Sequence, residues 1–229
     1  MIKIYFFSLK GLIFTLNFVK IIQIIINKIY VEENPLKKLV IKTALITLAS
    51  LIGAMTIAFG ATAICAPGFT AGFFDGVGNY SAAVFFYEKQ YQKTSDVDDL
   101  VVLVDNIDYR WDLNSAEKYL NLLLAHVDFD DFCAQNQNGF SQKEYYYGNY
   151  ALVLAKKGKF SVALSVSTIY VNECGYTKYN PYRVLILDYN GATTEQLNQI
   201  LDKLTALTGS ISDTTQQGYL NEDISNLTN

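Results

Sequence analysis

The sequence predicts an all-α fold, in which an N-terminal transmembrane helix is followed by a helical domain built as an α-solenoid or as a helical bundle. Three observations lead to this prediction. A long uncharged stretch lies near the N-terminus, several later segments begin with helix-capping residues, and apolar residues in those segments recur at helical spacing. The chain has 229 residues, enough for one domain with a core plus an anchoring segment.

The uncharged stretch runs from residue 43 to residue 74. Its first part, TALITLASLIGAMTIAFGATAIC (residues 43–65), is longer than the roughly 20 residues that a helix needs to cross a bilayer. We therefore expect residues 39–66 to form a transmembrane helix that contacts lipid through residues 43–65. A cleaved signal peptide is the alternative, since Lys37, Lys38 and Lys42 precede an apolar run that ends in small residues. The length of the run favours an anchor.

A hydrophobic and basic segment, residues 1–38, precedes this helix. Its apolar part, residues 4–30, is interrupted by Lys10 and Lys20, and a lysine near the middle of a bilayer is unfavourable. This segment either lies in the membrane interface, spans the membrane with difficulty, or comes from a start codon assigned too far upstream.

The distribution of charge predicts an orientation. Residues 1–66 contain seven lysines and two glutamates, which leaves 11 basic and 20 acidic side chains and a net charge of −9 beyond them. The positive-inside rule places the N-terminal flank in the cytoplasm and the domain after residue 67 on the extracytoplasmic side of the cell membrane. An acidic domain argues against nucleic acid as a partner. Frequent Ile, Asn, Lys and Tyr residues favour a bacterial cell envelope protein.

The extracytoplasmic domain, residues 67–208, is expected to be helix after helix. Capping signals mark four helix starts, at Ser95–Asp98, Asn114–Glu117, Ser141–Glu144 and Thr193–Gln196. After residue 193 the apolar residues recur at helical intervals of three and four. Residues 184–189, VLILDY, have some strand character, although a short helix fits them equally well. Residues 209–229 are polar and aperiodic and predict a flexible tail.

One stretch, GNYALVLAKKGKFSVALS (residues 148–165), has the pattern of a helical hairpin. Ala151 and Ala163 would let two helices approach, Gly158 fits a helix C-cap, and Leu154 and Phe160 would close the apolar contact. This spacing resembles a tetratricopeptide-repeat (TPR) hairpin over residues 144–173. The resemblance implies a TPR-like α-solenoid that binds peptides or proteins. It covers one degenerate hairpin, so a non-repeating helical bundle stays the alternative.

Residues that could carry chemistry are few. His126 is the single histidine and lies near Asp128, yet no GxSxG, HExxH or CxxC pattern accompanies it. The aspartates between residues 96 and 112 lack the glycine and glutamate positions of an EF-hand. We therefore predict no catalytic residue, no metal site and no cofactor. Cys133 and Cys174 are compatible with a disulfide or with two free thiols.

Tyr146, Tyr147 and Tyr150 are the candidate partner-binding residues, because tyrosine offers a large, rigid contact area at low entropic cost. We predict a membrane-anchored helical scaffold or adaptor, not an enzyme, that binds a protein or peptide partner. One alternative is a cell-envelope enzyme, or an enzyme subunit, with a site near His126. Another is that the membrane helix itself assembles with other spans. A groove lined by tyrosines, with His126 apart from it, would favour the scaffold.

Overall fold

A computed structural model describes residues 35–107, 112–135 and 142–228. These residues form helices and no β-strand, which confirms the predicted all-α fold. The chain divides between Cys65 and Ala66 into two compact units. The expectations for residues 1–30 and for a helix cap at residue 141 fall outside the described residues.

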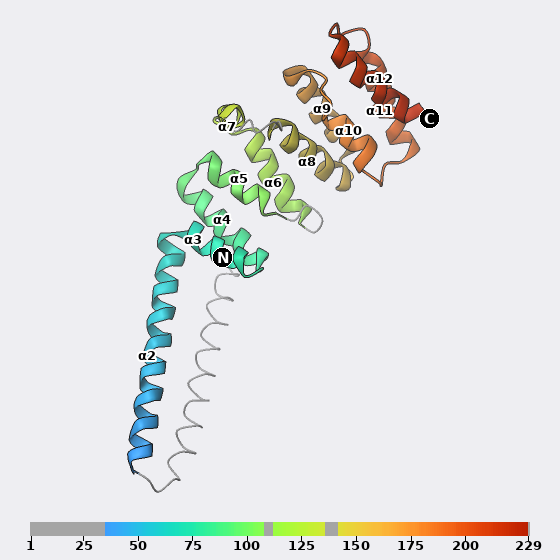
Figure 1. The fold of residues 1–229 in the computed structure, drawn as a ribbon. Helices are drawn as coiled ribbons and strands as arrows, with labels where there is room; N and C mark the ends of the chain where they lie inside the picture. Colours follow the sequence, from blue (N-terminus) through green and yellow to red (C-terminus); the bar gives the residue numbers. More distant parts are fainter. Residues whose placement is uncertain (1–34, 108–111, 136–141, 229) are drawn as a thin grey trace. The chain divides into compact units, whose positions relative to one another are not determined.

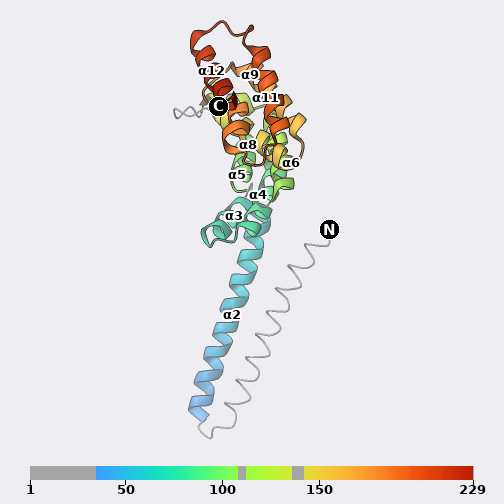
Figure 2. The same ribbon diagram turned by 90° about the vertical axis from the view of Figure 1, so that its right-hand side faces the viewer.

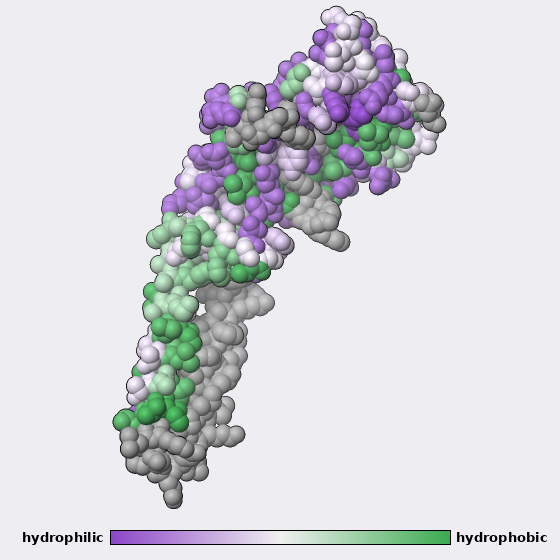
Figure 3. Space-filling view, viewed as in Figure 1, coloured by the Kyte–Doolittle hydropathy of each residue, from purple (hydrophilic) through white to green (hydrophobic). Residues whose placement is uncertain are grey.

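The described part of the first unit is one long helix, α2 (Pro35–Cys65) (Figure 1). Within it, Leu39–Cys65 is long and apolar enough to cross a membrane, and its apolar window is not buried inside the protein. Hydrophobic side chains follow its surface in Figure 3. This exposure is what a helix surrounded by lipid requires, because a core helix of a soluble domain would be covered by protein.

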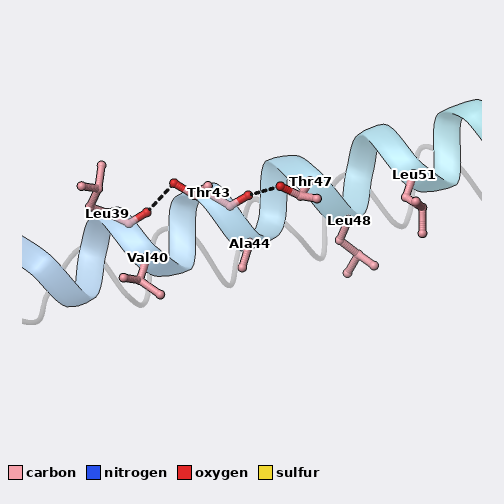
Figure 4. Close-up of a pocket in the computed structure, with 7 residues that line it drawn as sticks. All are labelled: Leu39, Val40, Thr43, Ala44, Thr47, Leu48 and Leu51. Carbon is pink, nitrogen blue, oxygen red and sulfur yellow. Dashed lines mark hydrogen bonds between the residues drawn. The ribbon is translucent and has the colours of Figure 1, made fainter.

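The threonine hydroxyls of α2 are satisfied within the helix. Those of Thr43 and Thr47 each donate 2.9 Å hydrogen bonds to the carbonyls of Leu39 and Thr43, between apolar side chains (Figure 4). The hydroxyls of Thr56 and Thr62 donate in the same way, over 2.8 Å, to the carbonyls four residues earlier. The hydrocarbon core of a bilayer offers no water to such groups, so this bonding suits a membrane-spanning helix.

The second unit is a succession of packed helices (Figure 1, Figure 2). It consists of α3 (Pro67–Gly76), α4 (Tyr80–Thr94), α5 (Val97–Asp105), α6 (Leu113–Leu124), α7 (Phe129–Gln135), α8 (Gln142–Lys156), α9 (Phe160–Cys174), α10 (Pro181–Arg183), η1 (Val184–Asp188), α11 (Thr194–Leu207) and α12 (Thr214–Thr228). Chain neighbours pack on one another from α3 to α6, and α6 then packs on α8, with the short α7 against α5 and α8. The α8–α9 pair is followed by α10 and η1, and α12 packs on η1 and α11.

A single hydrophobic core connects the helices from α5 to α12. Its largest fully buried side chains come from α5, α6, α8, α9, α10, η1 and α11 and from the loop after α9: Leu100, Leu103, Leu120, Leu123, Tyr146, Leu154, Tyr170, Tyr176, Tyr182, Leu185, Ile200 and Leu204. Four of them are tyrosines, whose hydroxyls bond to nearby polar groups while their rings fill the core.

Only one of the predicted capping boxes in the described residues is present as predicted. The Thr193 side chain accepts from the Gln196 amide at 3.2 Å, and the Gln196 side chain accepts from the Thr193 amide at 2.9 Å. Helices α5 and α6 are capped instead by Asp96 and Asp112, whose carboxylates accept from backbone amides two or three residues further on. The predicted caps were Ser95, one residue before Asp96, and Asn114, two residues after Asp112. An ionised aspartate is as good a cap as serine or asparagine, which makes neighbouring candidates hard to rank.

The turn between α8 and α9 has the geometry that the sequence predicts for a helical hairpin. Gly158 has a φ of +74°, and its amide donates to the Ala155 carbonyl at 2.9 Å. The Lys159 amide donates to the Leu154 carbonyl, also at 2.9 Å, which completes a Schellman C-cap. The two alanines of the hairpin, at positions 151 and 163, are fully buried where the helices touch.

Two lysines beside this turn bind one glutamate of α6. The Nζ atoms of Lys157 and Lys159 lie 2.5 and 2.7 Å from carboxylate oxygens of Glu117. The hydrogen bonds from Lys157 and Lys159 hold the pKa of Glu117 below its usual value of 4.5. Because the pKa of Glu117 is lower in the folded than in the unfolded protein, the ion pairs stabilise the fold at pH values above the pKa of the unfolded state. This stabilisation is lost as the pH falls through the pKa of Glu117 in the folded state.

Replacing this glutamate should therefore flatten the pH dependence of stability. We expect Glu117→Gln to lower the free energy of unfolding at neutral pH by on the order of 1 kcal/mol, and to leave it unchanged well below pH 4.5. Urea unfolding of the full chain in detergent micelles, repeated across the acid range, measures this. Asp202→Asn, at an exposed position of α11, is the matched control. The same pH profile for wild type and both variants would contradict the assignment.

The prediction of a flexible tail from residue 209 is wrong for α12. Leu220 and Asp223 of this helix are fully buried. Asp223 accepts hydrogen bonds from the Tyr176 hydroxyl at 2.8 Å and from the Asn180 side chain at 3.2 Å. The segment looks polar in sequence because part of its docking surface is a polar network, which apolar periodicity does not reveal.

Candidate functional site

A groove lies on the second unit between α8 and the segment formed by α10 and η1. It holds about 350 Å³, which is within the range of small binding sites. One wall is on α8 and the other begins just before α10. The lining residues are Glu144, Tyr145, Gly148, Asn149 and Leu152 on the first wall, and Tyr179, Arg183, Val184, Leu187 and Asp188 on the second. We call this feature the α8–η1 groove.

Two backbone features shape the groove. Gly148 is buried on α8, and a Cβ atom placed there would lie 3.2 Å from Cγ2 of Val184, so the glycine permits a close approach of the two walls. On the other wall, residues 184–188 form a π-helical turn in which the Tyr189 amide donates to the Val184 carbonyl at 3.0 Å. The first five residues of the VLILDY stretch are thus helical. Single π-turns are rare and are frequently found at functional sites.

The exposed surface of the groove is aromatic and aliphatic. Tyr145, Tyr179 and Leu187 keep 39%, 47% and 49% of their surfaces exposed. Burial of the remaining part of Tyr145, with a contribution from Asp105, raises the pKa of its hydroxyl, so the side chain is neutral at physiological pH. The two tyrosines come from opposite walls and present exposed ring surface to the groove, with the Lys178 ammonium 5.3 Å from the centroid of the Tyr179 ring.

The charge that the groove presents is acidic. The guanidinium of Arg183 lies 2.9 and 3.3 Å from the two carboxylate oxygens of Glu222, and 3.2 Å from Oδ1 of Asp223. Its charge is therefore balanced by carboxylates of α12. Glu144 and Asp188 add negative charge to the two walls. Such a groove suits a segment that carries apolar and basic side chains.

The tyrosines predicted to bind a partner lie on α8 but do not line the groove. Tyr146 and Tyr147 are 1% and 7% exposed, and their hydroxyls donate to Asp105 at 3.1 Å and to Glu173 at 3.4 Å. Tyr150 is half-buried and donates to Asn121 at 3.1 Å. In the structure these three side chains hold α8 to its neighbours.

Sequence reasoning missed Tyr145, although a signal for it was available. Residues 145, 148, 149 and 152 follow the i, i+3, i+4, i+7 spacing of one helix face. This face carries Tyr145 and Asn149, together with a glycine that opens space beside them. The second wall could not be found in this way, because it lies about 35 residues further along the chain and its distance from α8 is set by packing.

Comparison with known proteins assigns neither a family nor a function to the chain. No protein-family model, curated protein or solved structure matches the chain. Function is therefore inferred from the side chains of the groove and from the apolar surface of α2.

His126 lies apart from the groove and connects two turns. Its Nε2 donates to the Ser95 carbonyl at 3.2 Å, and its Nδ1 accepts from the Asp128 amide, also at 3.2 Å. Both ring nitrogens thus bond to backbone groups of the turns after α4 and after α6. Within the described residues, no group of three or more His, Cys, Asp or Glu side chains is arranged to hold a metal ion.

The two cysteines of the second unit are free thiols in this structure. Both Cys133 and Cys174 are half-buried. Burial raises the pKa of Cys133 to about 11, and it also raises that of Cys174. A thiol with a raised pKa is protonated at neutral pH and is therefore a weak nucleophile.

Proposed function

We propose that the protein is a membrane-anchored helical scaffold or adaptor that binds a protein or peptide partner through the α8–η1 groove. The observation that carries the proposal is the pair of exposed tyrosines, Tyr145 and Tyr179, on opposite walls of that groove. Aromatic side chains in a concave surface are typical of sites that dominate binding energy in protein interfaces.

The chemistry of the groove narrows the kind of partner. Aliphatic surface from Leu152 and Leu187 would contact apolar side chains, and the carboxylates of Glu144 and Asp188 would attract basic ones. The acidic balance beyond residue 66 would add long-range attraction for a basic partner and disfavour nucleic acid. A short segment that alternates apolar and basic residues fits both properties.

A single-pass topology in the cell membrane is part of the proposal. The exposed apolar surface of α2 and its internally bonded threonines support an anchor, with residues 43–65 in contact with lipid. The excess of lysines on the N-terminal side supports a cytoplasmic N-terminal flank and an extracytoplasmic second unit.

We further propose that α8 and α9 are a TPR-like hairpin within an α-solenoid. Support comes from the Schellman turn at Gly158, from the buried Ala151 and Ala163, and from the packing of helices in chain order. Tyr147 and Tyr150 stand where TPR hairpins usually carry tryptophan and leucine. An enzyme with a site near His126 is not favoured by the backbone contacts of that ring.

Photo-crosslinking in the native host tests the groove directly. A benzoylphenylalanine placed at Tyr145, Tyr179 or Leu187 should capture the same partner. The matched controls are Val162 and Ile169 of α9, which are 46% and 48% exposed and do not line the groove. We expect Asp188→Lys to lower the captured yield at Leu187 about tenfold, equivalent to ~1.4 kcal/mol, because it reverses a charge in the groove.

Identity of the captured protein decides the outcome. One partner at all three groove positions, absent from both α9 positions and sensitive to the charge reversal, supports the proposal. Equal capture of that protein from α9, or yields that Asp188→Lys leaves unchanged, would contradict a groove-specific adaptor.

A further inference from the structure

The helix that follows α2 exposes an apolar face. On α3 and at its C-cap, Phe69, Phe73 and Val77 keep 74%, 52% and 61% of their surfaces exposed. Their spacing of four residues places them along one side of the helix. The opposite side, with Pro67 and Ala71, is buried. The unit therefore presents large hydrophobic side chains outward, where a soluble surface would carry polar ones.

This face continues onto α4 through aromatic contacts. The Phe73 and Phe74 ring centroids are 5.7 Å apart, and Phe74 stacks on Phe86 of α4 at 5.5 Å. Phe86 in turn contacts Phe85 at 5.1 Å, and Phe85 is 39% exposed. Figure 3 shows hydrophobic residues gathered over these two helices. We call Phe69, Phe73, Val77 and Phe85 the α3–α4 apolar patch.

The chain connection limits how far the patch can lie from the end of α2. Ala66 is the one residue between Cys65, the last residue of α2, and Pro67, the first of α3. The apolar part of α2 has 27 residues and is about 40 Å long as a helix. That length exceeds the ~30 Å hydrocarbon layer and reaches the headgroup region even with a typical tilt. If the span ends at Cys65, the first residues of α3 therefore lie at the membrane surface.

The charge around the patch indicates which kind of lipid surface it can bind. Asp75 is the single charged residue between Lys42 and Glu88. Helix α3 carries no lysine or arginine, and the one basic group at the patch, the Lys89 ammonium 5.8 Å from the centroid of the Phe85 ring, is balanced by Asp75 and Glu88. Net attraction to anionic headgroups is therefore weak, and apolar contact dominates. Tyr80, 63% exposed at the start of α4, is a residue type enriched at membrane interfaces.

We infer that the α3–α4 apolar patch inserts into the interfacial layer of the same bilayer that holds α2. Lipid is its partner, and α3 lies in the headgroup region with Phe69 and Phe73 entering the acyl boundary. The second unit then contacts the bilayer through α3, in addition to its covalent connection to the span. This inference requires α2 to be a span, and it is independent of the groove.

Depth-dependent fluorescence quenching tests the inference on the full chain. Trp111 is the single tryptophan, so Trp111→Phe provides a silent background. Single reporters Phe73→Trp, Met55→Trp in α2 and Val162→Trp in α9 are reconstituted in phosphatidylcholine vesicles with lipids brominated at shallow or deep acyl positions. Phe73 and Val162 have similar exposures, 52% and 46%, so they form a matched pair.

The expected result has three parts. The Phe73→Trp reporter loses about half of its fluorescence or more to shallow bromines and less to deep ones, the depth of an interfacial helix. Met55→Trp is quenched most by deep bromines, and Val162→Trp by neither. Adding anionic phosphatidylglycerol leaves the Phe73→Trp quenching unchanged.

Two results would overturn the inference, and they can be told apart. Quenching of Met55→Trp without quenching of Phe73→Trp would show that α2 spans the bilayer but that solvent or protein, not lipid, covers the patch. Absence of quenching at both positions would show that α2 does not span the bilayer. Phe69→Trp repeats the measurement at a second position of the patch, in case the first substitution alters the packing of the phenylalanines.

Discussion

Asp223→Ala is expected to release α12 from the helical body, at a cost of about 3–5 kcal/mol in the free energy of unfolding. Asp223 is fully buried and accepts from the Tyr176 hydroxyl at 2.8 Å and from the Asn180 side chain at 3.2 Å. Its Oδ1 lies 3.2 Å from the Arg183 guanidinium, a charge pair rather than a well-aligned hydrogen bond. Removing the carboxylate leaves the Tyr176 hydroxyl and the Asn180 side chain without this acceptor and the Arg183 guanidinium without this charge partner, and that desolvation is the source of the loss.

Hydrogen exchange in detergent micelles locates this effect on α12. The amides of Thr214–Thr228 should exchange much faster in Asp223→Ala than in wild type, while those of α5 and α6 change little. Glu222→Ala is the control, because its carboxylate also binds Arg183 but is 53% exposed, and we expect only a small change. Equal effects of the two substitutions would show that the network depends on Arg183 and not on burial of Asp223.

Gly175→Ala is expected to be the second severe substitution, with a loss of about 2–4 kcal/mol from backbone strain and a broken contact. Gly175 follows α9 with φ +79° and ψ 177°, a conformation that is essentially restricted to glycine. An added Cβ atom would lie 2.9 Å from the side chain of Gln216 in α12. That side chain accepts from the Tyr176 amide at 3.0 Å, so the clash would also remove a hydrogen bond to α12.

Gly158→Ala separates strain from contact. Gly158 has a similar φ of +74°, but a Cβ atom there would meet nothing within 4 Å. The loss at Gly158 should therefore reflect the left-handed backbone alone, about 1 kcal/mol. Thermal unfolding of both variants in the same detergent measures the difference. A loss at Gly175 no larger than that at Gly158 would contradict a role for Gln216 in docking α12.

Both severe substitutions also bear on the groove. Arg183 lines the α8–η1 groove and is held by Glu222 and Asp223 of α12. α12 also packs directly on η1, which forms part of the second wall. We therefore expect that loosening α12 moves this wall and lowers partner capture at Tyr179 more than at Tyr145. If the proposed function holds, stability and binding are connected, because α12 supports the second wall of the groove.

Local patterns predicted the α8–α9 hairpin with little error. The spacing of Ala151 and Ala163, with Gly158 between them, is sufficient because helix contact and C-cap geometry depend on residues close in sequence. Partner binding by Tyr146, Tyr147 and Tyr150 stays a prediction; in the structure the first two are buried, and the neighbouring Tyr145 lines the groove. On a helix the difference between a core and a groove position is one residue, or about 100° of rotation.

By itself the sequence determined the all-α class, the position of the long apolar helix and the acidic balance of the helical unit, because these depend on composition and short-range periodicity. Tertiary structure alone decided that residues 214–228 form a docked helix and that the α8–η1 groove exists. The docked helix and the groove depend on tertiary structure for the same physical reason. A buried carboxylate such as Asp223 is stable only when donors from about 40 residues away surround it, and a groove wall such as η1 is placed by the packing of distant helices.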